Sequence, residues 1–410
     1  MSHELNSPSL RGIRLPDMSI LALDIFCGAG GVTHGLRKAG IKVAVGVDKN
    51  EDCRLSFTQN NPSVTFLSED VSHLNASALL SHIRSASKGD LLLLAACAPC
   101  QPFSSQNKHR DKAFDRAVLR HVERLVKEMR PDFLFIENVP GLQKVSGYSA
   151  FRRLRSTLRR LRYKTKCEVV DACSYGVPQH RKRLVLTASL HGESPWPVQS
   201  HGEVAGLAPF KTVREAISKY PRLSAGEEHP TVPNHIAAQL ADHNVKRLKA
   251  TPLDGGSRQE WPSKFVLECH KKHDGHPDVY GRLRWDAPAP TLTTKCTSLS
   301  NGRYGHPEQD RAISAREAAA LQGFDDTYMF HGGIRQITRQ IGNAVPPALA
   351  ERFGLAFVEH AGKLNGSRTR LPWQSIISKP SDPGLLTGRS NSRTIRGKDS
   401  SSAKRYHART

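Results

Sequence analysis

The sequence predicts an α/β protein with a mostly parallel sheet covered by helices, followed by a smaller, loop-rich domain. Short apolar runs alternate with amphipathic helical patterns through residues 20–188. A glycine-rich turn, CGAGG at 27–31, joins the first apolar run to a helical pattern, as in the first unit of a nucleotide-binding sheet. Beyond Ser189 this alternation stops, and residues 190–300 are rich in Pro, Gly and His. We therefore expect one sheet domain and one domain with few regular elements.

The composition narrows the classes of function. With 410 residues the chain is long enough for two domains. Its net charge of +22 and pI of about 9.9 favour a polyanionic partner, and nucleic acid is the first candidate. Eight cysteines at irregular spacing indicate reduced thiols and not a disulfide framework. No apolar run is long enough for a membrane span, and the first residues lack the apolar segment of a secretion signal. We therefore expect a cytoplasmic protein that binds nucleic acid.

Apolar runs ended by turn residues predict strands, and helical periodicity predicts the helices between them. The strands are expected at 20–26, 42–47, 64–67, 90–96, 132–139 and 167–172, with an extended segment at 176–188. The helices are expected at 32–39, 73–86, 115–129, 151–163 and 314–321, with a last one from Pro346. Six arginines occupy helix 151–163 beside its apolar face, and we interpret it as a solvated outer helix and not as a DNA-binding one.

The first strand ends predict a site for an adenosine-containing cofactor. Gly28, Gly30 and Gly31 let the backbone come close to a ligand. Asp48 ends the second strand about 20 residues after the glycines, where an acidic side chain suits a ribose hydroxyl pair. Asp70 follows the third strand, and a carboxylate there can accept from an adenine amino group. Because the spacing is GxGG and not GxGxxG, a merely tight turn is the alternative.

Cys100 falls on a loop just after strand 90–96, at the sheet edge where ligands bind in such folds. A cysteine there can act as a nucleophile if neighbouring groups lower the pKa of its thiol and hold the substrate atom that it attacks in place. With Cys97 it forms a CxxC, so a redox pair or half of a metal site are alternatives. Glu137 lies inside an apolar strand run, which is costly unless the carboxylate is paired or has a task. If the two strands are neighbours, Glu137 lies close to Cys100; a structural carboxylate is the alternative.

Alternating cations mark two further segments. In the first, the side chains of Gln179, Arg181 and Arg183 are expected to share one face of an extended segment. Such a face indicates that an anion or a carbonyl binds there; the alternative is that the arginines are ordinary surface residues. Arg282 and Arg284 are also expected to share a face, and arginine forks pair well with guanine in the major groove.

Two predictions concern the remaining motifs. Asn343 is expected in a Gly-Asn turn, ahead of a helix that packs back on the sheet. One cluster of cysteine and histidine residues has spacings that metal ligands use. We nevertheless expect no bound metal, because no second ligand pair stands at a suitable distance. The residues of that cluster are Cys269, His270, His273 and His276.

Taken in order, these motifs resemble those of the bacterial-type DNA (cytosine-5)-methyltransferase family, over most of residues 20–360. DIFCGAGG resembles the family's cofactor loop, APCQPFS its Pro-Cys nucleophile loop and ENV its catalytic glutamate strand. QHRKR fits the QxRxR motif, RQIGNAVPP the closing motif and APTLTT the Thr-Leu turn that ends the target-recognition domain. Asp48 stands where the family more often has Glu, and Glu69-Asp70 where Gly-Asp is usual, so an acceptor is kept at both places.

The resemblance implies an S-adenosylmethionine-dependent (Rossmann-like) methyltransferase sheet and a covalent mechanism. Cys100 would attack C6 of a cytosine flipped out of double-stranded DNA, so that C5 can take the methyl group. Glu137, with a raised pKa, would donate to or hydrogen-bond N3 of the base. Arg181 would hold O2, and Arg183 would support the loop and the phosphate.

The resemblance also implies the binding residues. Phe26 would pack on the adenine of S-adenosylmethionine, Asp48 would take the ribose and Asp70 the adenine amino group. The full set expected at the cofactor is Asp24, Phe26, Gly28, Gly30, Gly31, Asp48, Asp70, Pro99, Asn343 and Val345. The set expected at the DNA is Gln101, Ser104, Arg282, Arg284, Thr291 and Leu292.

The resemblance, with the composition, also divides the chain. We expect a flexible N-terminus at 1–18, a catalytic and cofactor-binding domain at 19–189, a target-recognition domain at 190–334, a C-terminal helix returning to the catalytic domain at 335–362 and a basic, disordered tail at 363–410. The tail holds eleven Lys/Arg against two Asp/Glu. We expect a monomer that acts on double-stranded DNA in a bacterial cytoplasm, with or without a separate restriction endonuclease.

Three other functions explain fewer of these residues. A tRNA-acting branch shares this fold, but its Cys-Phe-Thr tripeptide is absent, and Lys295-Cys296-Thr297 is not a match. A nicotinamide-dependent oxidoreductase would explain the glycine turn and Asp48, but not Cys100 or the QHRKR segment. A non-catalytic DNA-binding protein would not need an intact nucleophile, acid and arginines. DNA cytosine methylation explains the most residues.

Overall fold

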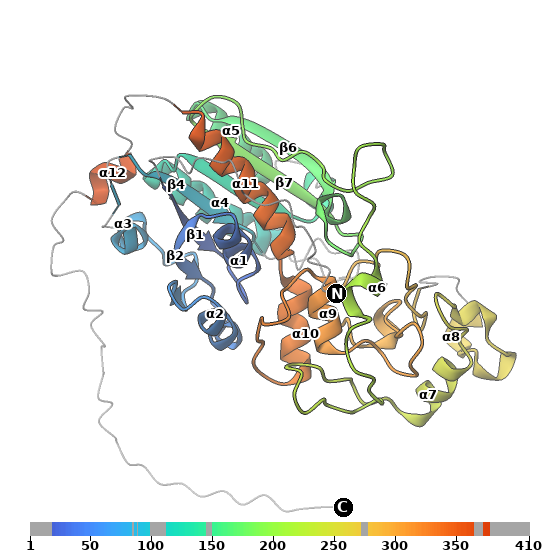
Figure 1. Cartoon of the computed structure of the whole chain (residues 1–410). Coiled ribbons are helices and arrows are strands. Elements are labelled where there is room, and N and C mark those ends of the chain that lie inside the picture. Colours follow the sequence, from blue (N-terminus) through green and yellow to red (C-terminus); the bar gives the residue numbers. More distant parts are fainter. Residues whose placement is uncertain are drawn as a thin grey trace, which may run out of the picture.

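A seven-stranded sheet forms the centre of the protein (Figure 1). The computed structural model describes residues 19–83, 86, 87, 89–98, 112–144, 150–271, 278–364 and 372–377. The strand order is β3-β2-β1-β4-β5-β7-β6. The strands are β1 (Ile20–Ile25), β2 (Lys42–Val47), β3 (Thr65–Leu67), β4 (Leu91–Ala96), β5 (Phe133–Asn138), β6 (Lys164–Asp171) and β7 (Lys182–Ser189).

The sheet is mostly parallel, with one antiparallel strand, β7, near one edge. Strands β1 to β5 pair in parallel and are joined through helices, whereas β7 pairs antiparallel with both β5 and β6. β1, β4 and β5 are buried along their whole length, as expected for parallel strands covered on both faces. The predicted α/β fold is confirmed, and most predicted strands lie within two residues of their observed bounds. The strand expected at 167–172 begins earlier, at Lys164.

Helices cover both faces of the sheet (Figure 1). On one face, α1 (Gly31–Lys38) packs against α11 (Pro347–Gly362), and both contribute to a core cluster that includes Phe353 and Phe357. On the other face lie α3 (Ala76–Leu80), α4 (Lys112–Met129) and α5 (Ala150–Arg160). α2 (Arg54–Asn60) lies beside β3 and buries Phe57. Each buried Phe side chain stabilises the fold by about 1.5–3 kcal/mol relative to an exposed one.

The region after β7 contains short helices and long irregular connections. Its helices are α6 (Val213–Ile217), α7 (Asp242–Lys249), α8 (Glu268–Lys271), α9 (Ala315–Leu321) and α10 (Ile334–Asn343). Short 3₁₀ helices in the described chain lie at Glu51–Cys53, Ser81–Ile83, Pro140–Lys144, Ala172–Tyr175, Arg258–Glu260, Ser263–Phe265 and Leu299–Asn301. The predicted helix 73–86 is therefore shorter, because it is divided into α3 and a 3₁₀ turn.

Buried arginines hold this loop-rich region together. The guanidinium of Arg311 forms a bidentate pair with Glu317, with both N–O distances at 2.7 Å. Arg316 donates to the carbonyls of Pro233 and Tyr328, at 2.8 and 2.7 Å. Irregular backbone leaves carbonyl groups without sheet partners, and the arginine donors satisfy them.

Segment 335–362 does not form the single expected helix. α10 contributes Ile337 and Ile341 to the core of the loop-rich region, whereas α11 packs on α1. Asn343 was expected in a turn, but it is the last residue of α10. The chain turns after it, at Ala344, because proline cannot continue a hydrogen-bonded helix and two prolines follow at 346 and 347.

The expected disordered tail is also partly wrong. Residues 372–377 form α12 (Pro372–Ile377), which contacts α3 and α4. Trp373 is fully buried in the sheet core, and its indole Nε1 donates to Asp132 Oδ2 at 3.1 Å. Composition alone could not predict this contact, since a single anchoring residue does not change the average of a polar segment. In the described chain, no helix is long and apolar enough to cross a membrane.

We predict that Trp373→Ala lowers the free energy of unfolding by about 3–5 kcal/mol, because it leaves a cavity and removes a donor from Asp132. Truncation after residue 377 is the matched control, and it should leave stability unchanged because it keeps α12. Urea denaturation of the three proteins measures both effects. Equal stability of Trp373→Ala and the full chain would show that α12 is not part of the folded core.

Candidate active site

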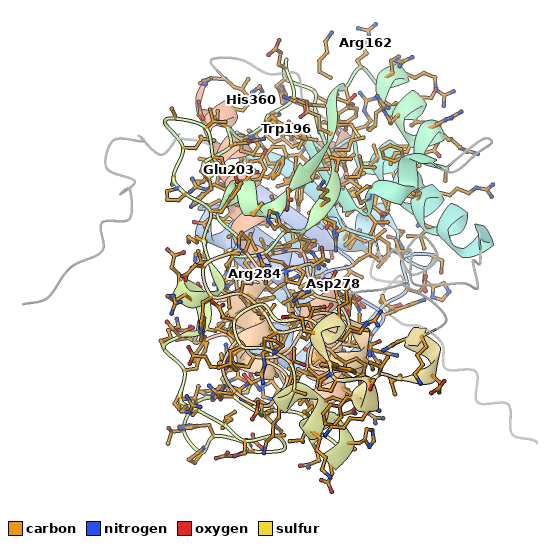
Figure 2. All side chains as sticks on the ribbon, turned by 90° about the vertical axis from the view of Figure 1, so that its right-hand side faces the viewer. Arg162, Trp196, Glu203, Asp278, Arg284 and His360 are labelled. Carbon is orange, nitrogen blue, oxygen red and sulfur yellow. The ribbon has the colours of Figure 1, made fainter. Side chains whose placement is uncertain are left out.

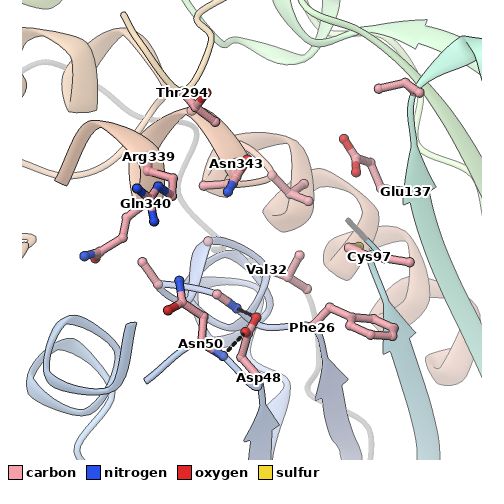
Figure 3. A pocket seen from close by; sticks show the side chains of 18 of the residues that line it. Phe26, Val32, Asp48, Asn50, Cys97, Glu137, Thr294, Arg339, Gln340 and Asn343 are labelled. Carbon is pink, nitrogen blue, oxygen red and sulfur yellow. Dashed lines mark hydrogen bonds between the residues drawn. The ribbon is translucent and has the colours of Figure 1, made fainter. Parts of the chain in front are cut away.

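A cavity of about 1440 Å³ opens at the carboxyl ends of the parallel strands (Figure 3). One side is formed by the residues after β1 and β2, and the other by β5, β7 and the end of α10. Residues of the loop-rich region at 290–294 close the third side. The cavity therefore lies where a doubly wound sheet binds its ligands.

The glycine turn forms the floor of the cavity. We call residues 26–31 the cofactor loop. Phe26 has a φ of 66°, an uncommon backbone conformation for a residue with a side chain. The amide of Gly28 donates to Asp48 Oδ2 at 2.9 Å, and the amide of Asn50 donates to Asp48 Oδ1 at 2.8 Å (Figure 3). Burial raises the pKa of Asp48, while these two amides lower it. Asp48 is thus fixed between two amides and faces the cavity.

Most of the expected cofactor residues line this cavity. Phe26, Gly28, Gly31 and Asp48 lie on its floor. Asp70 lies at its edge, with Lys49 Nζ 3.3 Å from its Oδ2, and the hydroxyl and amide of Ser72 lower its pKa to about 2. Asn343 and Val345 lie opposite the loop, at the end of α10 and in the connection to α11.

Two of the expected cofactor residues, Asp24 and Gly30, are not among the residues that line the cavity. Asp24 is fully buried inside β1, where it accepts from the hydroxyl of Thr33 at 2.6 Å, and burial raises its pKa to about 7. Gly30 has a φ of 95°, and a Cβ there would lie 2.7 Å from the Tyr328 hydroxyl. The motif includes both residues, but their role in this structure is to shape the loop.

The expected nucleophile loop falls outside the described residues. Pro99, Cys100, Gln101 and Ser104 are among the residues of which the structure says nothing. Its start is described: Cys97 lines the cavity directly after β4.

Glu137 lies near the end of β5, on the wall of the same cavity (Figure 3). The carbonyl of Ala98 accepts from Asn138 Nδ2 at 3.4 Å, which ties the end of β5 to the chain after β4. Glu137 Oε1 lies 2.9 Å from Arg183 Nε, and both side chains are largely buried. The predicted neighbourhood of strands 4 and 5 is thereby confirmed, and Glu137 is paired with a cation.

Arg181 is buried at the cavity and donates to backbone carbonyls. Its Nη1 donates to the carbonyl of Leu292 at 2.9 Å, and its Nη2 donates to those of Gly342 and Ala344 at 2.8 and 3.1 Å. The residue is 2% exposed. A guanidinium whose terminal nitrogens serve three carbonyls is a structural link between β7, the loop-rich region and α10. Arg181 also lines the cavity, so its expected contact with the base stays a prediction, and Arg183 is the arginine that pairs with Glu137.

The two arginines of the second segment point in different directions. Arg282 is fully buried, donates to the carbonyls of Leu248, Thr251, His306 and Gln309, and pairs with Asp310. It cannot read DNA. Arg284 is exposed and lines a second cavity of about 800 Å³ with Lys182 and Thr291. The predicted shared face is wrong because this segment forms one isolated bridge and no strand, so its side chains do not alternate as in a sheet.

Of the Thr-Leu turn, one residue is exposed and one is not. The Thr291 side chain lies on both cavities and donates its hydroxyl to the carbonyl of His180 at 2.7 Å. Leu292 is 1% exposed and packs in the core of the loop-rich region, although it also borders the first cavity, so its expected contact with DNA stays a prediction. Figure 2 shows Arg284 and Asp278 near the junction of the two regions, with Arg162 at the far end of the sheet domain.

Some residues of the site were not predicted. Asn50 supplies an amide to Asp48, and the Asp-x-Asn pattern after a strand is a usable turn signal. Arg339 and Gln340 line the cavity from the last turns of α10. Tyr328 reaches the cofactor loop from the loop-rich region, and nothing in the local sequence indicates that contact.

Potential metal ligands gather at one place in the described chain. The ligand atoms of Asp171, Cys173 and His180 lie within 4.8 Å of one another. Asp171 Oδ1 accepts the amide of Arg181 at 2.7 Å, and its Oδ2 lies 3.1 Å from His180 Nδ1. These contacts explain the cluster as a brace between β6 and β7. Of the Cys/His cluster considered above, 272–277 and the side chain of Cys269 lie outside the described residues.

A Rossmann-like sheet with a glycine turn and acidic strand ends at one cavity is the architecture of a nucleotide-binding site. The model of the C-5 cytosine-specific DNA methylase family matches residues 20–359. The chain therefore belongs to that family, and its class of enzyme is DNA (cytosine-5)-methyltransferase.

Individual relatives agree. The Type II methylase M.HgiDII of Herpetosiphon aurantiacus is 37% identical over 333 residues, which cover 80% of this chain and 92% of that protein. The Type II methyltransferase M1.HphI of Haemophilus parahaemolyticus is 32% identical over 83% of this chain and 87% of that protein. A DNA modification methyltransferase from an E. coli prophage has the same fold, with a TM-score of 0.63 and 23% identity over 83% of this chain and 99% of that one.

The different contacts of Arg181 and Arg183 predict different effects of their removal. Arg181→Ala should lower the free energy of unfolding by about 2–4 kcal/mol, because buried carbonyls lose charged donors. Arg183→Ala should keep most of the stability but lower the rate of methyl transfer at least tenfold, because Glu137 loses its partner. Thermal unfolding and single-turnover transfer of radiolabelled methyl groups to DNA measure the two effects. The reverse pattern would contradict this prediction.

Proposed function

We propose that this enzyme transfers a methyl group from S-adenosylmethionine to C5 of a cytosine in a specific double-stranded DNA sequence, through a covalent bond between Cys100 and C6. The observation that carries the proposal is the pair of Glu137 and Arg183 on the cavity wall, next to the strand that leads to Cys100. An acid, a cation and a thiol at one cavity are the groups that addition to a pyrimidine ring requires.

The cavity floor fits the adenosine part of S-adenosylmethionine. The carboxylate of Asp48 uses one lone pair of each oxygen for an amide and faces the cavity, which suits two ribose hydroxyls. Asp70 lies where it would accept from an adenine amino group, and the Phe26 ring lines the same floor. When bound, S-adenosylmethionine supplies an electrophilic methyl group.

The protein residues supply the rest of the chemistry. The Cys100 thiolate would form a bond to C6, and the electron pair of the C5–C6 double bond would become available at C5. Glu137 would hydrogen-bond N3 and stabilise the charge that develops on the ring, and Arg183 would keep Glu137 in place. After methylation, loss of the C5 proton restores the double bond as the Cys100–C6 bond breaks.

DNA would lie across the junction of the two regions. A base inside a duplex cannot reach a cavity at the sheet edge, so the cytosine must be flipped out. Arg284, Lys182 and Thr291 surround the second cavity beside the active one and are placed for contacts to the duplex. Gln101 and Ser104, on the nucleophile loop, are also proposed to contact DNA. The net charge of +22 favours binding to the phosphate backbone.

The family match supports DNA over tRNA, because the family model that covers residues 20–359 is described as a DNA methylase. Two relatives are named Type II methylases, which supports a role beside a separate restriction endonuclease. We further propose that the enzyme acts as a monomer, since one subunit contains every residue that the transfer requires, and that it works at the DNA of a bacterial cytoplasm.

The proposal predicts that the enzyme forms a stable covalent complex with DNA that contains 5-fluorocytosine. Fluorine at C5 cannot leave as a proton does, so the bond to Cys100 would be trapped. Cys100→Ser should give no complex while it keeps binding the duplex, and Cys97→Ser is the matched control that should still form it. Denaturing gel electrophoresis in the presence of S-adenosylmethionine measures the complex. A complex with Cys100→Ser, or none with the unaltered enzyme, would contradict the proposal.

A further inference from the structure

The back of the cofactor loop is held by the loop-rich region. The hydroxyl of Tyr328 donates to the carbonyl of Ala29, and Asn61 Nδ2 donates to the same hydroxyl at 3.4 Å. A Cβ at Gly30 would lie 2.7 Å from the Tyr328 oxygen, so the loop can approach the tyrosine this closely because a glycine stands there. The other side of the loop lines the cavity. One phenol therefore contacts the loop directly opposite the proposed cofactor.

Further contacts on both sides of Tyr328 join the same elements. Asp325 Oδ2 lies 2.8 Å from His34 Nε2 on α1, and Asp325 Oδ1 accepts from Lys38 at 3.2 Å. Asn60, at the end of α2, donates to the carbonyl of Met329 at 2.7 Å and accepts from the amide of Met329 at 2.9 Å. We call residues 325–331 the clasp, because they hold α1, α2 and the cofactor loop together.

The clasp is packed into the core of the loop-rich region. Arg316, 1% exposed, donates to the carbonyl of Tyr328 at 2.7 Å. The Tyr328 ring packs on Phe324 and Phe330, with ring centroids 4.7 and 5.3 Å away. Ala29 of the cofactor loop belongs to the same apolar cluster. The loop is therefore packed into the core of the region that is proposed to read DNA.

We propose that Tyr328 is a positioning residue that holds the cofactor loop in its binding conformation and so links affinity for S-adenosylmethionine to the loop-rich, DNA-reading region. This inference rests on the proposed function, because it takes S-adenosylmethionine as the ligand of the loop.

Tyr328 is expected to affect ligand affinity because the Ala29 carbonyl depends on it for a hydrogen bond. Ala29 is 2% exposed, so its carbonyl would lose a buried donor if the hydroxyl of Tyr328 were absent. The loop would then spend part of its time in other conformations, and the apparent dissociation constant of its ligand would rise as the competent fraction falls. Burial raises the pKa of Tyr328, which keeps the phenol protonated as a donor.

The test compares two Tyr→Phe variants that each remove one hydroxyl. Tyr328→Phe removes the donor to the cofactor loop. Tyr220→Phe removes a hydroxyl that donates to Asp326 of the same clasp at 2.6 Å, without contact to the loop. Isothermal titration with S-adenosylhomocysteine measures the dissociation constant of each variant. It should be about threefold to tenfold larger for Tyr328→Phe, and it should change less than twofold for Tyr220→Phe. In steady state, KM for S-adenosylmethionine should rise with little change in kcat.

A second pair keeps the test valid if Tyr328→Phe folds poorly. Asp325→Ala and Asp326→Ala alter neighbouring, half-exposed carboxylates, with 44% and 52% of the side chain exposed. Asp325 bonds to α1, whereas Asp326 bonds to Lys219 and Tyr220 inside its own region. Asp325→Ala should weaken binding about twofold to threefold, and Asp326→Ala should not.

Two outcomes separate this inference from the proposed function. If the unaltered enzyme binds S-adenosylhomocysteine but the two members of each pair behave alike, the role of Tyr328 is refuted and the proposed cofactor stands. If the unaltered enzyme does not bind S-adenosylhomocysteine, both the proposed cofactor and this inference are refuted.

Discussion

The antiparallel pairing of β5 with β7 is the constraint on which the site depends. Glu137 lies opposite Val185 in that pairing, so Arg183, two residues before Val185, is its diagonal neighbour on the same face. The parallel register of β4 with β5 places the end of β4 beside the same carboxylate. A glutamate in a buried strand is costly without a partner, and Arg183 supplies one at 2.9 Å. Three strands from distant parts of the sequence thus fix Glu137, its partner Arg183 and the start of the proposed nucleophile loop.

A second constraint is that the cavity is built from both regions of the chain. Arg181, directly before β7, donates to the carbonyls of Leu292, Gly342 and Ala344, and Tyr328 links the loop-rich region to the cofactor loop. The cofactor side and the proposed DNA side therefore share hydrogen bonds, and neither wall of the cavity is positioned by one region alone. This arrangement suits an enzyme that has to bring a methyl donor and a flipped base to one point.

The regular part of this architecture could be predicted from the sequence, and the irregular part could not. The strands are mostly apolar runs, so the positions of β2 and β5 and the residues at their ends, Asp48 and Glu137, follow from local pattern. Arg282 and Trp373 were misjudged for one reason. Charge and composition do not say which way a side chain points when no strand or helix sets its direction, and long-range contacts then decide its burial.

The central claim is that Cys100 and Glu137 methylate C5 of cytosine in DNA, and bisulfite sequencing of DNA from expressing cells tests it most directly. The comparison needs three strains, which express the unaltered enzyme, Cys100→Ser and Glu137→Gln. The account predicts cytosines protected within one short sequence motif in the first strain and none in the second. In the third, protection at that motif should be strongly reduced, by about 10²-fold or more in rate. Protection that survives Cys100→Ser, or no protected cytosine in any strain, would contradict it.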